Sequence, residues 1–143
     1  MKIIDPEFTI YGPPGLDVGS VLSGLVLAAV HHKHSGTGAE ALTSLRTGAG
    51  LIWEKYSTAM VAEGIDASVV ATIGVETVGY TVAEVCRTAL GFAGGRHWLK
   101  FEDAAVQAAA VATAMGIVER CMKARHNGGM DLLFAEFDAL ATP

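Results

Sequence analysis

Two carboxylates near the start of the chain have the spacing of a metal site. Asp5 follows the short β-type run Lys2–Ile4, and Glu7 stands two residues further on. Side chains two residues apart in an extended segment point to the same side. Mg²⁺ is commonly bound by one or two carboxylates together with substrate phosphates. A turn acid next to a solvated acid is the alternative, and the spacing of the two residues leaves both interpretations open.

The segments around these acids predict a short β-hairpin element followed by a helix. Pro6 pushes Asp5 into extended geometry, so that residues 2–4 and 8–11 are expected to form two short strands. Gly12-Pro13-Pro14-Gly15 is a rigid turn that ends them. Asp17 is expected to start the next helix, with its side chain near free backbone N–H groups.

The rest of the chain has helical periodicity. The helix after Asp17 is apolar on all sides, which is typical of a helix at the centre of a core. Further helices are predicted from about Ala39 to Ala62, from a cap at Asp66 to about Phe92, and from Glu102 or Asp103 to about Arg125, where Asn127-Gly128-Gly129 stops the last of these. A short helix from Met130 to Leu140 follows. The prediction is a mainly α domain over residues 1–143, with about five helices and a short N-terminal β-hairpin element.

The N-terminal segment resembles the C-terminal lobe of the methylthioribose kinases, in the aminoglycoside phosphotransferase and choline kinase superfamily. That family carries Asp-Pro-Glu-Phe, then Tyr-Gly-Pro-Met-Gly-Phe-Asp-Ile-Gly-Ala and an apolar helix. The chain has Asp5-Pro6-Glu7-Phe8 and then the ten residues from Tyr11 to Ser20 at the same spacing. The resemblance implies a kinase-like C-lobe, with residues 1–15 as the strand and turn segment and residues 16–143 helical.

The resemblance also implies roles for four residues. Asp5 matches the metal-binding aspartate of the kinase site, with Glu7 beside it, and Asp17 is implied to be structural, tying the loop to the helix. Arg87 matches the first arginine of a pair on the sugar-substrate side. The second arginine is replaced by Thr88, and Lys100 stands where the family has an aspartate, so the substrate side departs from the family's pattern.

Other residues with chemical potential have simpler explanations. His31, His32 and His34 could form a metal cluster, but with Lys33 they also suit a helix C-terminus, which favours cations. Cys86 and Cys121 lie in apolar helical patterns, as buried thiols do in a reducing compartment. His97 forms no recognisable catalytic pair with Cys86, and Trp53 and Trp98 are more typical of packing.

Composition restricts the possible partners. The chain is 51% hydrophobic and 17% charged, with a net charge of −5, which disfavours nucleic acid because that needs a basic surface. The N-terminus lacks the apolar run of a secretory signal, so an intracellular location, cytoplasmic or within an organelle, is expected. The longest uncharged stretches, Val18–His32 and Ala104–Val118, are shorter than the roughly 20 residues of a membrane span, so no transmembrane segment is predicted.

Two functions remain open. Phosphoryl transfer needs a nucleotide-covering loop, a phosphate-binding lysine and a catalytic loop together, and the family has these before its Asp-Pro-Glu-Phe motif. Since the motif begins at Asp5, the first expectation is a non-catalytic interaction subunit, with other protein subunits covering an exposed cleft face and no cofactor of its own. The alternative is a piece of an S-methyl-5-thioribose kinase completed by another chain, which would use Mg²⁺ and ATP. A third possibility is a regulatory domain that binds Mg-nucleotide without turnover.

Overall fold

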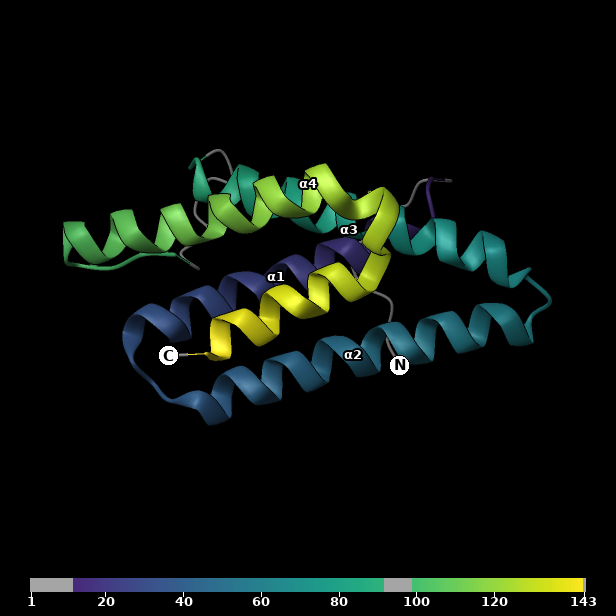
Figure 1. The fold of residues 1–143 in the computed structure, drawn as a ribbon, viewed down its shortest axis with the longest axis horizontal. Coiled ribbons are helices and arrows are strands. Elements are labelled where there is room, and N and C mark those ends of the chain that lie inside the picture. Colours follow the sequence, from purple (N-terminus) through teal and green to yellow (C-terminus); the bar gives the residue numbers. More distant parts are fainter. Residues whose placement is uncertain (1–11, 92–98, 143) are drawn as a thin grey trace, which may run out of the picture.

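The protein is a bundle of four helices in the parts of the chain that the structure describes. A computed structural model describes residues 12–91 and 99–142. The helices are α1 (Gly15–Ser35), α2 (Ala39–Ala62), α3 (Ala67–Ala89) and α4 (Ala104–Ala141). Figure 1 shows α1 inside the bundle, with α2 along one side of it and α3 along another. The mainly α character expected from the periodicity is present.

The predicted count of about five helices with an N-terminal β-hairpin is wrong. Residues 12–91 and 99–142 form four helices and contain no strand. The two predicted strands, residues 2–4 and 8–11, lie outside the described residues. The predicted helix break at Asn127-Gly128-Gly129 coincides with a kink at Gly129, where the backbone is non-helical and the two helical arms of α4 (Ala104–Ala141) meet.

Instead of ending α4, the glycines bend it. Gly129 has φ 50° and ψ −140°, a conformation that costs little for glycine and much for other residues. Figure 1 shows the helix turning sharply there, so that its C-terminal arm (yellow) runs back against the rest of the bundle. Arg120 and Glu136, one on each arm, form two hydrogen bonds of 2.7 Å that hold the arms together. A helix-breaking sequence therefore produces a folded-back helix.

The helix ends confirm two of the three predicted caps. Asp66 accepts a hydrogen bond from the Ser68 N–H, and Asp103 accepts from the N–H groups of Ala105 and Val106, as expected of N-cap carboxylates. The third cap is wrong. Helix α1 begins at Gly15 after Pro14, with no side-chain cap, and Asp17 lies within the first turn.

The core is built around α1, which contacts all three other helices. The apolar residues of α1 that are at most 2% exposed are Leu22, Val26, Leu27, Ala29 and Val30. They meet Val78, Val82 and Val85 of α3 and the apolar residues of both arms of α4 in one continuous cluster. The prediction of a central, fully apolar helix is confirmed.

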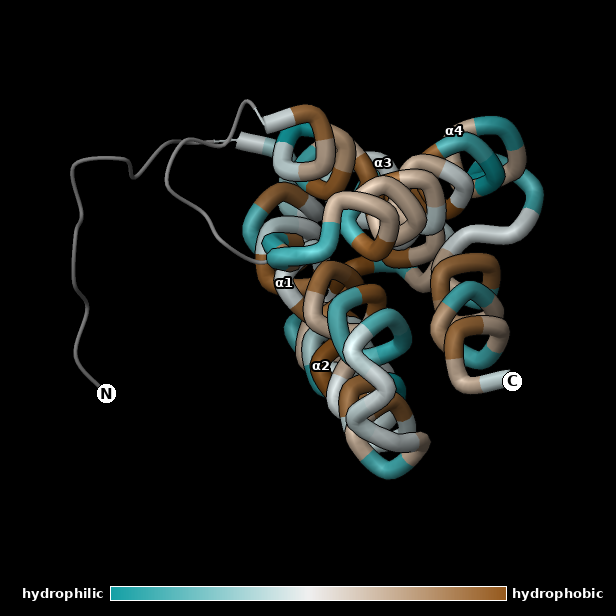
Figure 2. The backbone as a smooth tube through the Cα atoms, turned by 90° about the vertical axis from the view of Figure 1, so that its left-hand side faces the viewer, coloured by the Kyte–Doolittle hydropathy of each residue, from teal (hydrophilic) through white to brown (hydrophobic). Residues whose placement is uncertain are grey.

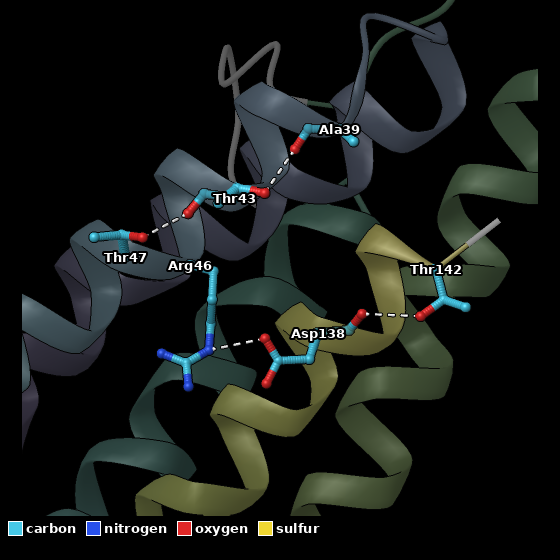
Figure 3. A network of polar contacts seen from close by, with 6 residues as sticks. All are labelled: Ala39, Thr43, Arg46, Thr47, Asp138 and Thr142. Carbon is cyan, nitrogen blue, oxygen red and sulfur yellow. Dashed lines mark hydrogen bonds and ion pairs between the residues drawn. The ribbon is translucent and has the colours of Figure 1, made fainter.

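Polar contacts hold the C-terminal arm of α4 to α1 and α2. Arg46 of α2 donates to the Asp138 carboxylate at 3.1 Å, as Figure 3 shows, and its guanidinium lies 4.4 Å from the centre of the Phe134 ring. Lys33 of α1 donates to the carbonyl oxygens of Leu140 and Thr142. These carbonyls end a helix, where four acceptors lack intrahelical partners, so the lysine supplies a cap from another helix.

Three of the four helices have long apolar stretches. Figure 2 shows hydrophobic residues on every helix of the bundle. By length and composition, Gly15–Ser35, Ala67–Ala89 and Ala104–Ala141 are each long and apolar enough to cross a membrane. The shares of buried residues in their most apolar windows differ, at 44%, 50% and 22% respectively. The bundle therefore buries α1 and α3 much more completely than α4.

Candidate functional site

The two predicted metal ligands, Asp5 and Glu7, lie outside the described residues. The kinase-like segment is described from Gly12 onward, where it forms the first turns of α1. Asp17 is exposed there. Within residues 12–91 and 99–142, no three histidine, cysteine, aspartate or glutamate side chains are grouped closely enough to hold a metal ion. The described residues alone therefore do not make the predicted Mg²⁺ site.

The glycines of the kinase-like segment bring α1 close to α3. A Cβ at Gly15 would lie 2.8 Å from both the backbone nitrogen and Oγ1 of Thr77. A Cβ at Gly19 would lie 2.7 Å from Tyr80 Cβ and 2.9 Å from the Thr77 carbonyl oxygen. Distances this short leave no room for a side chain on α1. In the described structure, these glycines serve helix packing.

Tyr56 of α2 fixes the start of α1. Its hydroxyl donates a hydrogen bond of 3.0 Å to the carbonyl oxygen of Pro14. Burial, and then the negative charge of Asp17, raise the pKa of Tyr56 above its usual value. The hydrogen bond from Tyr56 joins α2 to the turn that precedes α1.

Arg87, the predicted substrate-side residue, lies near the C-terminal end of α3. Its guanidinium makes two hydrogen bonds to Glu84, of 3.2 and 2.9 Å. This hydrogen bonding, together with the glutamate's charge, raises the pKa of Arg87. Thr88, at the position of the family's second arginine, is buried, whereas Lys100 is exposed. An arginine at position 88 would have to bury its charge in the bundle, which is unfavourable without a partner.

Arg87 stands at the edge of an apolar groove between α3 and α4. The groove has a volume of about 430 Å³ and is lined by Val82, Ala83, Cys86, Arg87, Leu90, Val118 and Met122. Leu90 and Met122 are 53% and 48% exposed. We call this hollow the α3–α4 groove. Its chemistry suits apolar side chains far better than a sugar.

The cysteines and the histidine cluster show no arrangement for catalysis. Cys86 and Cys121 are both free thiols, and Cys121 is fully buried. Burial raises the pKa of the Cys121 thiol to about 11, which makes it a poor nucleophile at neutral pH. His97 and Trp98 lie outside the described residues, so their predicted roles stay predictions.

The three histidines at the end of α1 contact α4 and two connecting segments. His34 makes a hydrogen bond of 2.9 Å with the Thr113 hydroxyl on α4, and His31 stacks on the Phe101 ring with their centres 4.7 Å apart. His32 makes a hydrogen bond with Thr37 in the following loop. The helix ends at Gly36 in the left-handed conformation. The cluster is a helix C-terminus, the simpler of the two interpretations.

A second groove, between α2 and α3, was not predicted. Its volume is about 600 Å³, and it is lined by Trp53, Ser57, Thr58, Val61, Ala62, Ala67, Val70 and Ala71. We call it the α2–α3 groove. Val61, Ile65 and Val69 near the turn between these helices are 49%, 36% and 49% exposed. The only signal in the sequence was a run of alanines and valines, which periodicity cannot separate from core residues.

The α2–α3 groove lies near the start of the kinase-like helix. Trp53 lines the groove, packs against the position of Gly74, and has its ring centre 5.9 Å from that of Tyr56. Tyr56 in turn holds Pro14. The start of α1 and the α2–α3 groove are thus connected through two neighbouring aromatic side chains, Tyr56 and Trp53.

The amino-acid sequence of this chain was compared with those of known proteins. The chain is similar to the methylthioribose kinases. It is 29% identical to the methylthioribose kinase of Bacillus cereus over 101 residues, covering 64% of this chain and 25% of the kinase. The methylthioribose kinases of Bacillus thuringiensis and Bacillus anthracis are 28% identical over the same length and shares.

The similarity to methylthioribose kinase is distant and partial. The chain spans a quarter of the length of the curated kinases that it matches. No family model and no solved structure matches it. The similarity supports a relationship at the level of this family or its superfamily.

Proposed function

We propose that this chain is a non-catalytic helical subunit, derived from a methylthioribose-kinase-like protein, that packs against another polypeptide through the α2–α3 groove. The observation that carries the proposal is the open apolar surface of that groove. Val61 lines it with 49% of its surface exposed, and Trp53 is only partly buried. Apolar surface that is concave and exposed is typical of protein interaction sites.

The shape of the groove suits an apolar helix. Helices α2 and α3 meet at the turn around Gly64 and have few contacts elsewhere, so a furrow runs between them. Its lining has small residues, Ala62, Ala67 and Ala71, which allow a close approach of another backbone. The aromatic ring of Trp53 supplies the kind of large apolar contact that dominates binding energy in interfaces.

Complex formation tests the proposal. Tagged chain with Val61→Lys is compared with wild type by copurification and by the mass of the native complex. A lysine in the groove would bury its charge against apolar surface, so we expect binding to weaken at least about tenfold. Leu51→Lys is the matched control, because Leu51 is also 49% exposed on α2 but does not line the groove.

The result would contradict the proposal if the Val61 variant retained the wild-type complex, or if both variants lost it equally. Circular dichroism of the two purified variants checks that each keeps the helical content of the wild type. A partner that dissociates from the Val61→Lys chain alone identifies the groove as its binding site.

The second candidate function is a piece of a working methylthioribose kinase completed by another chain. Two observations favour it: the Asp5-Pro6-Glu7-Phe8 motif and the similarity to the Bacillus kinases. In that case Asp5 and Glu7 would contribute carboxylates to a Mg²⁺–ATP site, and Arg87 would stand on the substrate side. The catalytic loop and the nucleotide lobe would come from the completing polypeptide.

Activity separates the two candidates. The chain is mixed with a polypeptide that carries the nucleotide lobe and catalytic loop of such a kinase, and ATP turnover is measured with methylthioribose. Turnover that Asp5→Ala abolishes supports the kinase piece. If no turnover occurs, and Asp5→Ala leaves complex formation unchanged, the interaction subunit is supported. A thermal shift of the isolated chain with Mg-ATP would instead support nucleotide binding without turnover.

A further inference from the structure

The turn between α2 and α3 carries two acidic side chains at the end of the α2–α3 groove. Glu63 directly follows Ala62 of the groove lining, and Asp66 directly precedes Ala67. Both acidic side chains are exposed, and neither forms an ion pair among residues 12–91 and 99–142. We call Glu63 and Asp66 the acidic tip. The apolar groove therefore has a negatively charged end.

The sequence on both sides of the acidic tip supplies no neighbouring positive charge. Residues 56–86 contain no lysine, arginine or histidine. Lys55, which precedes them, makes a hydrogen bond of 3.3 Å to the carboxylate of its neighbour Glu54. Hydrogen bonds from Ser68 lower the pKa of Asp66, so that this carboxylate is ionised at neutral pH. The negative charge of the tip is therefore available to a partner.

The acidic tip stands where a second protein can reach it. Figure 1 shows the α2–α3 turn projecting at one end of the bundle, while α2 and α4 begin toward the opposite end. Val61, Ile65 and Val69, around the tip, are 49%, 36% and 49% exposed. Exposed apolar side chains and exposed carboxylates thus occur together on a projecting part of the molecule.

The lining of the groove brings a partner helix close to the acidic tip. The side chains next to the tip, Ala62, Ala67 and Ala71, are small, whereas the large ring of Trp53 lies further along α2. A helix with apolar residues at intervals of three and four fills such a groove. Its backbone can approach most closely over the alanines, where the displacement of water strengthens the interaction between nearby charges. A basic side chain at that end of the helix is therefore favoured.

Charge also distinguishes a basic partner from other occupants of the groove. A helix with acidic residues would bring like charges against Glu63 and Asp66, which is unfavourable. A second copy of this chain has a net charge of −5, and the surface of an anionic bilayer is also negative. The acidic tip thus selects for a protein partner that carries positive charge.

We infer that the α2–α3 groove binds an amphipathic helix of a partner protein, and that lysine or arginine side chains at one end of that helix pair with Glu63 and Asp66. The inference rests on the proposed function, since it takes the groove as the binding site, and it adds the charge of the partner and the direction of its helix. The basic end of the helix lies at the acidic tip, and its apolar side chains lie between Trp53 and the alanines of the groove.

Two synthetic helical peptides test the charge of the partner. They share one apolar face and are about 20 residues long, because much shorter isolated helices are marginal in water. One peptide has lysines at one end, and the other has glutamates at the same positions. Binding to the full chain is measured by fluorescence anisotropy. We expect the lysine peptide to bind at least about tenfold more tightly at low salt, and the difference to shrink to about twofold or less in about 0.5 M salt, which screens the charges.

Variants that remove charge locate the effect on the protein. Glu63→Gln with Asp66→Asn removes both charges of the acidic tip and keeps a cap for α3, because asparagine caps a helix as well as aspartate does. We expect the preference for the lysine peptide to fall to about threefold or less. Glu40→Gln with Asp103→Asn is the matched control, since it removes one exposed glutamate of α2 and one N-cap aspartate where α2 and α4 begin, away from the α2–α3 turn (Figure 1). This control changes the net charge by the same amount and should leave the preference unchanged.

Equal binding of the two peptides, or an unchanged preference in the Glu63→Gln, Asp66→Asn chain, overturns the inference. Binding of neither peptide overturns it as well. Circular dichroism checks the helical content of the variants, and Glu63→Gln alone, which leaves the Asp66 cap in place, gives the same test if the double variant unfolds.

Copurification with Val61→Lys reports on the groove separately. If that variant loses its partner while the two peptides bind equally, the proposed function stands and only the basic partner is wrong. If Val61→Lys retains the complex and also leaves peptide binding unchanged, the groove is not the binding site and both proposals fail.

Discussion

Helix α1 and the first arm of α4 are similar in composition and opposite in environment. Helix α1 is rich in leucine, valine and glycine and the first arm of α4 in alanine and valine, and both helices are long and apolar enough to be candidate membrane spans. Yet 44% of the most apolar window of α1 is buried, against 22% for α4. Helix α1 contacts all three other helices and leaves only a narrow strip around Val21 exposed, whereas the first arm of α4 leaves Ala108 and Met122 exposed. An apolar helix is therefore not by itself a core helix.

The difference in burial between α1 and α4 is accompanied by a difference in what their glycines contact. Gly15 and Gly19 of α1 lie at its crossing with α3, where they bring the two backbones together and exclude water from the surrounding valines. Gly116 of α4 faces only the guanidinium of Arg120 on its own helix, the far end of a flexible side chain. Glycines of α1 thus pack against a second helix, whereas Gly116 of α4 packs against none.

The sharpest test of this comparison truncates one apolar side chain in each helix. Leu22 of α1 is completely buried, so Leu22→Ala should lower the free energy of unfolding by about 3 kcal/mol, within the range for buried leucine. Met122 of α4 is 48% exposed, so Met122→Ala should cost less than about 0.5 kcal/mol in the monomer. Urea unfolding at low protein concentration measures both. Equal losses would mean that α4 is as well packed as α1.

The second test adds a methyl group at the close helix crossing. Gly19→Ala would bring a Cβ within 2.7 Å of Tyr80, so α1 and α3 must move apart, at a cost of about 2 kcal/mol. Gly48→Ala is the matched control, because Gly48 lies inside α2 with no atom within 4 Å of a Cβ there. That change should raise stability by about 0.5–1 kcal/mol. Thermal unfolding of the pair distinguishes close packing from helix propensity.

A third test concerns the ion pair that folds α4 back on itself. The Glu136 side chain is 9% exposed and accepts two hydrogen bonds from Arg120, whose side chain is 59% exposed. Because the arginine is well solvated, Glu136→Gln should cost about 1 kcal/mol, less than a fully buried pair would. Glu119→Gln removes the exposed pair with Lys123 and should change stability by less than about 0.5 kcal/mol. Chemical denaturation compares the two, and an equal effect would show that the arms do not depend on this pair.

The smallest effect is expected at the contact between α1 and α4. Burial, and then the charge of Lys33, lower the pKa of His34 below 6.5, so the folded state takes up a proton less readily than the unfolded state. The contribution of His34 to stability is therefore present above pH 6.5 and is lost as the pH falls below it. His34→Gln keeps a group that can bond to Thr113 and should flatten this part of the pH profile. An unchanged profile would show that another group titrates there.

Local signals in the sequence predicted much of the bundle. The structure confirms the approximate bounds predicted for α2, the cap at Asp66 and Asp103 as one of two predicted starts of α4, because an N-cap depends on a side chain and the two or three N–H groups next to it. The break at Asn127-Gly128-Gly129 was placed correctly, since the backbone of α4 is non-helical at Gly129. Whether such glycines end a helix or bend it depends on contacts made far along the chain, such as that of Arg120 with Glu136.

The surroundings of Arg87 could be predicted from the sequence only in part. Arg87 was selected by resemblance, and its pairing with Glu84 follows from their spacing of three residues on one helix. The groove beside it needs Val118 and Met122, which come from a distant part of the chain. Periodicity marked these residues as apolar helix positions without distinguishing a core face from an open one.

By itself, the sequence determined which segments are helical and apolar, where α2, α3 and α4 begin, and that the segment from Asp5 to Ser20 resembles methylthioribose kinases. Hydrogen bonding within a helix and at its caps is local, so neighbouring residues suffice for these conclusions. The tertiary structure alone decided that Gly15 and Gly19 pack α1 onto α3, that α4 folds back at Gly129, and that Met122 of α4 stays exposed. Those outcomes depend on which helices meet, because burial is a property of pairs of surfaces and not of a sequence pattern.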